Sequence, residues 1–550
     1  MVGQVSKRRP ISEWTALLRD TKSAFHSRLS QIYGDNDDLR NEAAQICLRT
    51  LQAFADSYGP DRSVIIVRST GRANLLGTHI DHRGGSVNPV CIKQVWLVAE
   101  PRDDDLVLAK NVESSEFRDE QFRISDCLPA GKRIQNWDVW CHDEFDKRKD
   151  DLSITWSNYI RAPVLYFQHL NTQDDGTFAP ALKGMNMMIY GDVPRAAGLS
   201  SSSAIVLLTA EAVRQINGLD IEPAELAEHC GYAEWYVGTR GGCSDHAAII
   251  FGKPDAILHI TAFPTTVDSV ELPSAYSLVL ADSLIEAKKQ ATARDAFNSR
   301  VAAYQFGLMM IRKNFPEYAD QLAHLRDVNP EKLGIDEAEI YRIVKSLPAS
   351  ASRTDILNVL VEQERQIRHL FRSHDEPEQG YQIRQICLYG IAECIRASLV
   401  PQCLRTGDMK TFGELINVSH DGDRVTKLLD GKRVPTDNSY PDARIDALIS
   451  DLRSGDAARV SQARLWRQNG GYDVSLPELD MLVDIARASP GVLGAGLVGA
   501  GMGGCIVVLV EKEDAPRLIE NMAEQYYRPR HLPLRAEAIT PVGGLCTVDV

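Results

Sequence analysis

The chain has 550 residues, of which 25% are charged and 44% hydrophobic, and its formal net charge is −14. This length exceeds what one hydrophobic core usually organises, so we expect two substantial domains with a cleft between them. No segment approaches the roughly 18 consecutive apolar residues of a membrane span, and no run of Lys or Arg is long enough to follow a phosphate backbone. The composition argues against both a membrane-spanning protein and a nucleic-acid partner.

The 11 cysteines include no C-x-x-C pair, and their odd number and irregular spacing indicate reduced thiols rather than disulfides or a zinc ribbon. We therefore expect no structural metal. The start of the chain, MVGQVSKRRPISEWTALLRD, has basic residues but no apolar core after them and no small-residue cleavage site. A secretory signal is not expected, and the expected location is the cytoplasm.

Residues 1–60 are predicted to form a helical extension. Apolar residues recur at helical spacing in WTALLRD and AAQICLRTLQAF, and the turn signal Tyr58-Gly59-Pro60 ends the pattern. The apolar runs VIIV (64–67) and VWLV (95–98) then predict two strands.

Between these strands lies the loop GRANLLGTHIDHRGG, residues 71–85, which is punctuated by Gly and dense in Arg, Asn, His and Asp. So many polar groups cannot all be buried, because a buried unpaired charge is costly. We expect this loop to bind a ligand rich in hydroxyl groups, with a surface loop of no function as the alternative.

The polar, acidic stretch 101–180 is predicted to form hairpins and a surface insertion around WSNYIRAPVLYF. After it, GLSSSS (198–203) stands directly before a helix expected to begin near Ala204 and to stop at Asn217-Gly218. Glycine lets the backbone turn closely around a phosphate, and the free N–H groups of a helix N-terminus attract one. The serines could supply oxygen to Mg²⁺, or they could merely cap the helix.

A second helix is predicted from Pro223 to about residue 237. It is followed by GGCSDHAAIIFG, in which Asp245 alone would most simply be a turn residue. The stretch 276–420 is predicted to be mostly helical, and 421–470 to be loop and helix insertion.

Near the C-terminus, GAGLVGAGMGG (494–504) contains the pattern G-x-G-x-x-G. A dinucleotide-binding interpretation needs a helix after that pattern, but here a strand (506–510) follows, with a helix around 514–525. The loop is then either a structural turn or part of another nucleotide site, because the sequence has no P-loop motif. Strands and helices mixed in both halves indicate the α+β class.

The three glycine-containing loops together resemble, in order and separation, the three signature motifs of the GHMP kinase superfamily, on its galactokinase-like branch. GRANLLGTHIDHRGG resembles the sugar-binding signature of that branch, VPRAAGLSSSSA its phosphate loop, and GLVGAGMGGC its C-terminal glycine motif. WSNY, FNSR, SHDG and YDVSLPELDMLV also resemble stretches of that family, so the resemblance covers roughly residues 55–550. It implies a two-lobed α+β fold, with a mixed-sheet lobe at 61–275 and an α+β lobe at 276–550, after the helical extension.

The resemblance also implies an activity, in which MgATP phosphorylates the anomeric hydroxyl of a sugar. Asp245 would face that hydroxyl, as a base or as an orienting group, and Arg72 would stand beside it. Mg²⁺ would be held by Ser202 and Glu234, with Glu225 and Glu228 as possible replacements for Glu234. The ATP phosphates would lie along Gly198, Leu199, Ser200, Ser201, Ser202, Ser203 and Ala204, close to Gly501 and Gly503.

The sugar-binding signature departs from the family at one position. Galactokinases usually carry Glu-His-Thr-Asp-Tyr where this chain has Thr78-His79-Ile80-Asp81-His82, so His79 and Asp81 match sugar-hydroxyl ligands but one acid is missing. A carboxylate at that position would repel a uronic acid. Its replacement by Thr78, with His82 and Arg83 close by, resembles the galacturonokinase branch and favours a uronic acid as substrate. The resemblance thus implies that Thr78, His79, Asp81, His82 and Arg83 bind the sugar.

Two alternatives stay open. One is a galactokinase, or a kinase for an amino sugar, on the same fold. The other is a non-catalytic sensor that binds ATP and sugar; the retention of residues 200–204, Arg72, Glu234 and Asp245 speaks against it. Oligomeric state and the residues around the adenine are beyond the motifs.

Overall fold

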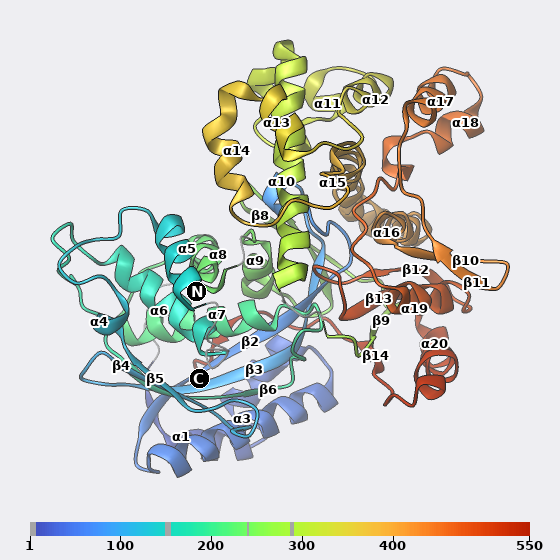
Figure 1. Ribbon diagram of the computed structural model, residues 1–550. Coiled ribbons are helices and arrows are strands. Elements are labelled where there is room, and N and C mark those ends of the chain that lie inside the picture. The colour runs from blue at the N-terminus through green and yellow to red at the C-terminus, as the bar shows by residue number, and fades with distance from the viewer. Residues whose placement is uncertain (1–6, 149–155, 239–240, 287–290) are drawn as a thin grey trace.

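The computed structural model describes residues 7–148, 156–238, 241–286 and 291–550. Figure 1 shows its elements in two lobes, with the N-terminal lobe, blue to green, at lower left and the C-terminal lobe, yellow to red, at the top and right. Each lobe combines helices with a sheet, which confirms the predicted α+β class.

A seven-stranded mixed sheet forms the N-terminal lobe. Its order is β1-β2-β3-β6-β4-β5, with β15 also paired to β2, and only the β4–β6 pair is parallel. The strands are β1 (Arg9–Pro10), β2 (Ser63–Asn74), β3 (Pro89–Pro101), β4 (Leu106–Asn111), β5 (Glu120–Arg123), β6 (Met185–Gly191) and β15 (Cys546–Thr547). β2 and β3 contain the two predicted strands, and both are buried almost throughout because helices cover both faces of the sheet.

The predicted helical extension packs on one face of this sheet. It comprises α1 (Ile11–Arg19), α2 (Ala24–Tyr33) and α3 (Asp37–Tyr58), and α3 ends at Gly59 where the turn signal was expected. Trp14 and Phe25 from these helices share a buried cluster with Trp96 of β3. The extension therefore closes the outer face of the N-terminal sheet, as Figure 1 shows.

The opposite face of the sheet is covered by α6 (Ser157–Leu170), α7 (Ser201–Asn217) and α8 (Pro223–Glu234). The prediction of hairpins for 101–180 is right for β4 and β5, but wrong for α6, which is largely buried and contains Pro163 within it. The acidic residues around this segment dominate its composition, and a proline inside a helix weakens the helical signal. Two further helices, α4 (Ile124–Cys127) and α5 (Trp137–Arg148), precede it.

The C-terminal lobe is built on a four-stranded antiparallel sheet in the order β12-β13-β9-β14. These strands are β9 (Tyr276–Asp282), β12 (Val492–Leu497), β13 (Cys505–Glu511) and β14 (Ala536–Ile539), so the predicted strand 506–510 is confirmed as β13. Two hairpins stand apart from it, β7 (Ala256–Thr261) with β8 (Thr266–Glu271), and β10 (Thr426–Leu429) with β11 (Lys432–Pro435).

Helices make up most of the C-terminal lobe, as the sequence predicts for 276–420. They are α10 (Ala291–Asn314), α11 (Pro330–Leu333), α12 (Glu337–Lys345), α13 (Arg353–Val359), α14 (Glu364–Phe371), α15 (Ile383–Thr406), α16 (Met409–Asp423), α17 (Asp442–Leu452), α18 (Ala457–Gln462), α19 (Pro477–Arg487) and α20 (Ala515–Met522). Within the described ranges, no helix combines the length and apolar character needed to cross a membrane.

Candidate active site

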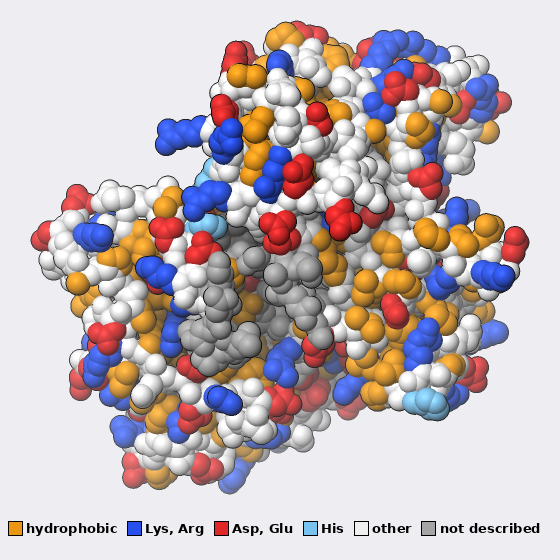
Figure 2. Space-filling view, viewed as in Figure 1, with side chains coloured by type: hydrophobic (Ala, Val, Ile, Leu, Met, Phe, Trp, Pro, Cys, Tyr) orange, Lys and Arg blue, Asp and Glu red, His pale blue; other side chains and the backbone are white. Residues whose placement is uncertain are grey.

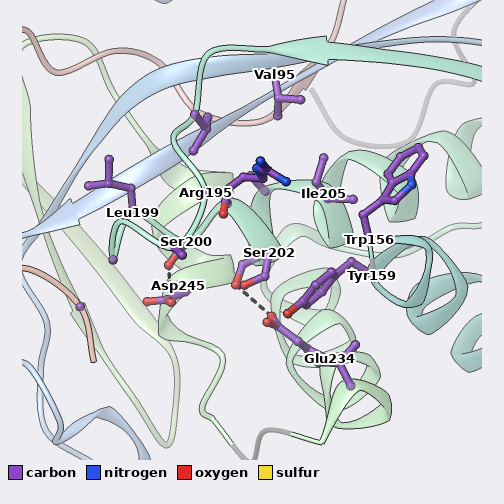
Figure 3. Close-up of a pocket in the computed structure, with 18 of the residues that line it drawn as sticks. Val95, Trp156, Tyr159, Arg195, Leu199, Ser200, Ser202, Ile205, Glu234 and Asp245 are labelled. Carbon is purple, nitrogen blue, oxygen red and sulfur yellow. Dashed lines mark hydrogen bonds between the residues drawn. The ribbon is translucent and has the colours of Figure 1, made fainter. Parts of the chain in front are cut away.

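A cavity of about 680 Å³ lies where the loop before α7 meets the end of α8, the start of α9 (Ser244–Phe251) and the C-terminal glycine loop. Figure 3 shows Ser200 and Asp245 toward one end of this cavity and Trp156 at the other, with Ser202 between them. The predicted residues that line it are Arg72, Gly198, Leu199, Ser200, Ser201, Ser202, Ser203, Ala204, Glu234, Asp245 and Gly501.

The serines before and at the start of α7 do not use their side chains as helix caps. Ser200 occupies the N-cap position in the left-handed region (φ 54°), yet its side chain makes no capping hydrogen bond. Its hydroxyl donates instead to Asp245, and the hydroxyl of Ser203 donates to Glu234 at 2.9 Å. The first-turn N–H groups of a helix have no partner within the helix, and here that turn lines the cavity. Such an arrangement is chemically suited to an anion such as a phosphate.

Arg72 and Asp245 come from different elements and meet in a two-point contact. Arg72 lies on β2 and donates from Nε and Nη2 to the two carboxylate oxygens of Asp245, each at 2.7 Å. Its Nη1 donates to the carbonyl of Gly198 at 2.6 Å. This fork geometry fixes the orientation of the carboxylate and ties it to the phosphate loop.

Glu234, the last residue of α8, lies on the same wall of the cavity. Besides Ser203, it contacts Nε2 of His246 at 3.0 Å, and 12% of its side chain is exposed. Glu225 and Glu228 are exposed on α8 instead. Ser202 lines the cavity, but the serine bonded to Glu234 is Ser203.

The first two predicted sugar ligands face the C-terminal lobe rather than the cavity. Thr78 is buried, with Oγ1 3.2 Å from the hydroxyl of Tyr389 on α15. His79, also buried, stacks on Tyr472 with ring centroids 4.2 Å apart, and its Nε2 lies 3.5 Å from Oδ1 of Asp423. No local pattern predicts these contacts, because the partner residues are more than 300 positions away in the chain; only Tyr472 lies in a stretch, YDVSLPELDMLV, that resembles the family.

Asp81 lies beside the segment that lines the cavity near Asp245. A Cβ atom added to Gly242 would come within 2.6 Å of Oδ2 of Asp81. Burial by itself would raise the pKa of Asp81, but hydrogen bonds from His82 and Ser244 outweigh it and lower the pKa to about 2. The carboxylate is therefore ionised at neutral pH and can accept hydrogen bonds from hydroxyl groups.

His82 and Arg83 complete this short turn. Burial, together with the charge of Arg83, lowers the pKa of His82, so its ring is neutral at pH 7. Burial lowers the pKa of Arg83 to about 10, which leaves the guanidinium charged. Among the described residues, Nε of Arg83 has no hydrogen-bond partner, although the guanidinium lies 5.9 Å from the ring centre of Tyr304.

An aromatic group at the far end of the cavity was not identified from the sequence. Phe117 and Trp156 pack edge to face with centroids 5.6 Å apart, and the guanidinium of Arg195 lies 4.9 Å from the ring centre of Phe117. Tyr159 lies between Trp156 and Glu234 in Figure 3. Such a wall suits a flat aromatic ligand. In the sequence, this wall is indicated by the motif WSNY, through its resemblance to the family.

The C-terminal glycine loop packs against the phosphate loop, backbone to backbone. Gly499 has φ +79°, and a Cβ there would lie 2.6 Å from the carbonyl oxygen of Gly198. Gly198 has φ +78°, and a Cβ there would lie 2.4 Å from the carbonyl oxygen of Val498. Gly501 lines the cavity, whereas Gly503, with φ 129°, belongs to the turn outside the lining. The loop therefore supports the phosphate site rather than forming a turn of its own.

Three protein-family models match separate parts of the chain. The "Galactokinase galactose-binding signature" matches residues 52–100, "GHMP kinases N terminal domain" matches 158–253, and "GHMP kinases C terminal" matches 448–528.

Curated relatives match most of the chain at low identity. The galactokinase of a Roseiflexus species is 28% identical over 478 residues, which are 86% of this chain and 90% of that protein. The galactokinase of Halalkalibacterium halodurans is 26% identical, covering 84% and 88%. The galactokinase of Dictyostelium discoideum is 24% identical, covering 90% and 93%.

Among solved structures, the galactokinase of Lactococcus lactis complexed with galactose superposes with a TM-score of 0.59 at 21% identity, over 90% of this chain and 98% of that one. At this identity the similarity concerns the fold alone. With the signature and both domains matched in order, the chain belongs to the GHMP kinase superfamily, on its galactokinase-like branch. It is a sugar kinase of that family, as the three motifs predicted.

Proposed function

We propose that the protein transfers the γ-phosphoryl group of ATP to the anomeric hydroxyl of a galactose-like sugar, giving the sugar 1-phosphate and ADP. One observation carries this proposal: Asp245 is bonded to both Arg72 and Ser200, so an acceptor-side carboxylate and a phosphate-binding turn form one hydrogen-bonded unit. Phosphoryl transfer depends mainly on such positioning and on charge stabilisation.

The cavity has a phosphate-suited end and an aromatic end, which favour one orientation of ATP. Its phosphates would lie against the first turn of α7, where the N–H groups and the helix dipole favour negative charge. Its purine would then reach the aromatic wall of Phe117, Trp156 and Tyr159, with Arg195 beside it.

Glu234 with a neighbouring serine hydroxyl forms an oxygen donor set of the kind that Mg²⁺ takes up together with phosphate oxygens. Ser202 and Ser203 both line the cavity as candidates for that hydroxyl. A bound Mg²⁺ would neutralise charge on the phosphates.

In the transfer, a bond forms between the anomeric oxygen and the γ-phosphorus, and the bond from that phosphorus to the bridging oxygen of ADP breaks. Asp245 orients the hydroxyl and either accepts its proton or directs the proton to solvent. Arg72 holds the carboxylate of Asp245 in place and offsets charge near the transferring group.

Galactose, a neutral sugar, is the first candidate substrate, because the curated relatives are named galactokinases. Asp81, ionised and next to Gly242, is the group that would accept hydrogen bonds from its hydroxyls. A uronic acid is the second candidate, because Arg83 carries a half-buried guanidinium whose Nε is unpaired among the described residues. A sugar carboxylate would satisfy that atom.

The test is ADP release from MgATP with galactose, galacturonate, glucuronate, N-acetylgalactosamine and arabinose, with the phosphorylated carbon assigned by NMR. The proposal expects turnover of at least one galactose-like sugar at C1. Arg83→Gln separates the two candidates: it should reduce kcat/KM for galacturonate by about 10-fold or more if Arg83 pairs with the carboxylate, and leave galactose within about twofold. Sugar binding without any turnover would contradict the proposal and favour the sensor.

A further inference from the structure

The loop that carries the sugar-binding signature, residues 71–85, is called the sugar loop below. It belongs to the N-terminal lobe in sequence, but contacts from the C-terminal lobe hold it in place. The N–H of Gly77 donates to Oε1 of Glu393 on α15 at 2.7 Å, and this contact is buried. Gly77 itself has φ +89°, and a Cβ there would lie 2.0 Å from the carbonyl oxygen of Ser86, so only glycine fits at this close approach.

Glu393 is the centre of a buried polar network. Its side chain is fully buried, as is that of Arg396, which donates from Nε to Oε2 of Glu393 at 2.7 Å. Ser419 donates to Oε1 at 2.9 Å, on the same oxygen that accepts from Gly77. A buried charge is kept only where it is paired and bonded, and here one of the bonded groups is the backbone of the sugar loop.

A second contact from the same face of α15 holds the next residue of the loop. Tyr389 lies one turn before Glu393, and its hydroxyl meets the hydroxyl of Thr78. His79 follows in the left-handed region, with φ 67°, and stacks on Tyr472. Three successive loop residues therefore take their positions from the C-terminal lobe.

We infer that Glu393 is a positioning residue for the sugar site, one that acts through Gly77 on His79 and Asp81. This inference rests on the proposed function. Asp81 is only four residues from Gly77, and its placement against Gly242 depends on the path of the loop between them. Tyr389 supports the same placement through Thr78.

The test is Glu393→Gln, which keeps the shape of the side chain. An amide has one acceptor oxygen, and if that oxygen stays with Arg396 the NH₂ group confronts the N–H of Gly77, donor against donor. Because hydrogen bonds to charged groups contribute roughly 1.5–3 kcal/mol, KM for the sugar should rise about 10- to 100-fold, with KM for ATP within about twofold. If Glu393 had only a general structural role, Glu393→Gln would instead raise KM for the sugar and KM for ATP together, or lower kcat alone, and either result would contradict the inference.

The matched control is Glu211→Gln. Glu211 on α7 is also buried and also pairs with an Arg three residues later, Arg214, but it bonds no residue of the sugar loop. Its loss should lower the melting temperature comparably and leave KM for the sugar unchanged.

Tyr389→Phe removes only a hydroxyl and tests the same loop if Glu393→Gln does not fold. It should raise KM for the sugar severalfold at an unchanged KM for ATP. An unchanged sugar KM in either folded variant, in an enzyme that phosphorylates the sugar, would overturn the inference alone. A wild-type protein that turns over no sugar would instead remove the proposed function.

Discussion

Glu234 shows how one side chain joins two parts of the site. It ends α8, accepts a hydrogen bond from Ser203 in the first turn of α7, and contacts His246 on α9. These three helices converge at this carboxylate, so its position is fixed before any ligand binds. A preformed oxygen donor of this kind is what Mg²⁺, with its strict geometry, requires.

The first prediction follows from this placement. Glu234→Gln should raise the Mg²⁺ concentration needed for half-maximal activity by about 10-fold or more, because an amide is a weaker ligand than a carboxylate. Steady-state rates across a Mg²⁺ titration measure this. Glu228→Gln, on the exposed face of the same helix, should behave as wild type. Equal Mg²⁺ requirements in both variants would assign the metal to other residues.

The sequence predicts the positions of some site residues but not the contacts of others. Arg72, Glu234 and Asp245 were placed by motifs, and all three line one cavity. Thr78 was expected to contact the sugar, yet its hydroxyl meets Tyr389, since a loop's polar groups can bond a distant helix that no local pattern reveals. The serine bonded to Glu234 is Ser203 rather than Ser202, because the helical phase at the start of α7 decides which hydroxyl faces α8.

At the scale of elements, the two glycine loops depend on each other. Gly198 and Gly499 face each other closely enough that neither tolerates a Cβ atom, and Cys505 N–H donates to the carbonyl of Ala197 at 3.1 Å. The C-terminal lobe therefore supports the shape of the phosphate loop in the other lobe.

The second prediction concerns this contact. Gly499→Ala should raise KM for ATP about 10-fold or more, because the methyl group would push the phosphate loop away from α7, and positive φ adds strain of about 1–3 kcal/mol. Gly407→Ala is the control: it has a similar φ of +73°, but nothing lies within 4 Å of its added Cβ. KM values and melting temperatures of the two variants separate backbone strain from collision. If both alanines affected KM for ATP equally, the loop contact would have no role in nucleotide binding.

Elements with strong local signals were predicted well. α7 ends at Asn217 and is capped by Gly218 in the left-handed conformation, and α8 starts at Pro223, as the Asn-Gly stop and the proline predict. α6 was missed because its burial depends on α7, α8 and the sheet, which a local pattern does not contain. The contacts of Glu393 and Tyr389 on α15 with the sugar loop are likewise formed only in the tertiary fold, so no local pattern predicts them.

At the scale of the whole molecule, two histidines, buried His374 and half-buried His169, make stability depend on pH. Burial, with the charge of Arg353, lowers the pKa of His374 to about 4, and burial, with the charge of Arg133, lowers the pKa of His169 to about 4, both from an ordinary value of 6.5. Between these values the unfolded chain binds more protons than the folded one, so stability falls as the pH is lowered from 6.5 toward 4. This pH dependence fades over about one pH unit above 6.5, where the unfolded chain also loses these protons.

The third prediction tests this source of acid sensitivity. His374→Gln, which cannot titrate, should reduce the pH dependence of unfolding between pH 6.5 and 4.5 by on the order of 1 kcal/mol per pH unit, whatever it does to stability at pH 7. Urea unfolding at several pH values, followed by tryptophan fluorescence, gives the slope. A slope identical to that of the wild type would show that His374 is protonated alike in both states.

Figure 2 shows acidic and basic side chains interspersed over one face of the molecule, a mixture that gives no broad field of one sign there.

The most direct test of the account compares sugar-dependent ADP formation by the wild type and by Asp245→Asn. We expect the wild type to release ADP only when a galactose-like sugar is present. The variant should lose about 100- to 10,000-fold in kcat, since positioned acid–base groups contribute on that scale, while its ATP binding stays within about twofold. A variant that turns over sugar at the wild-type rate would contradict the central claim, because the carboxylate held by Arg72 and Ser200 would then not be at the reacting hydroxyl.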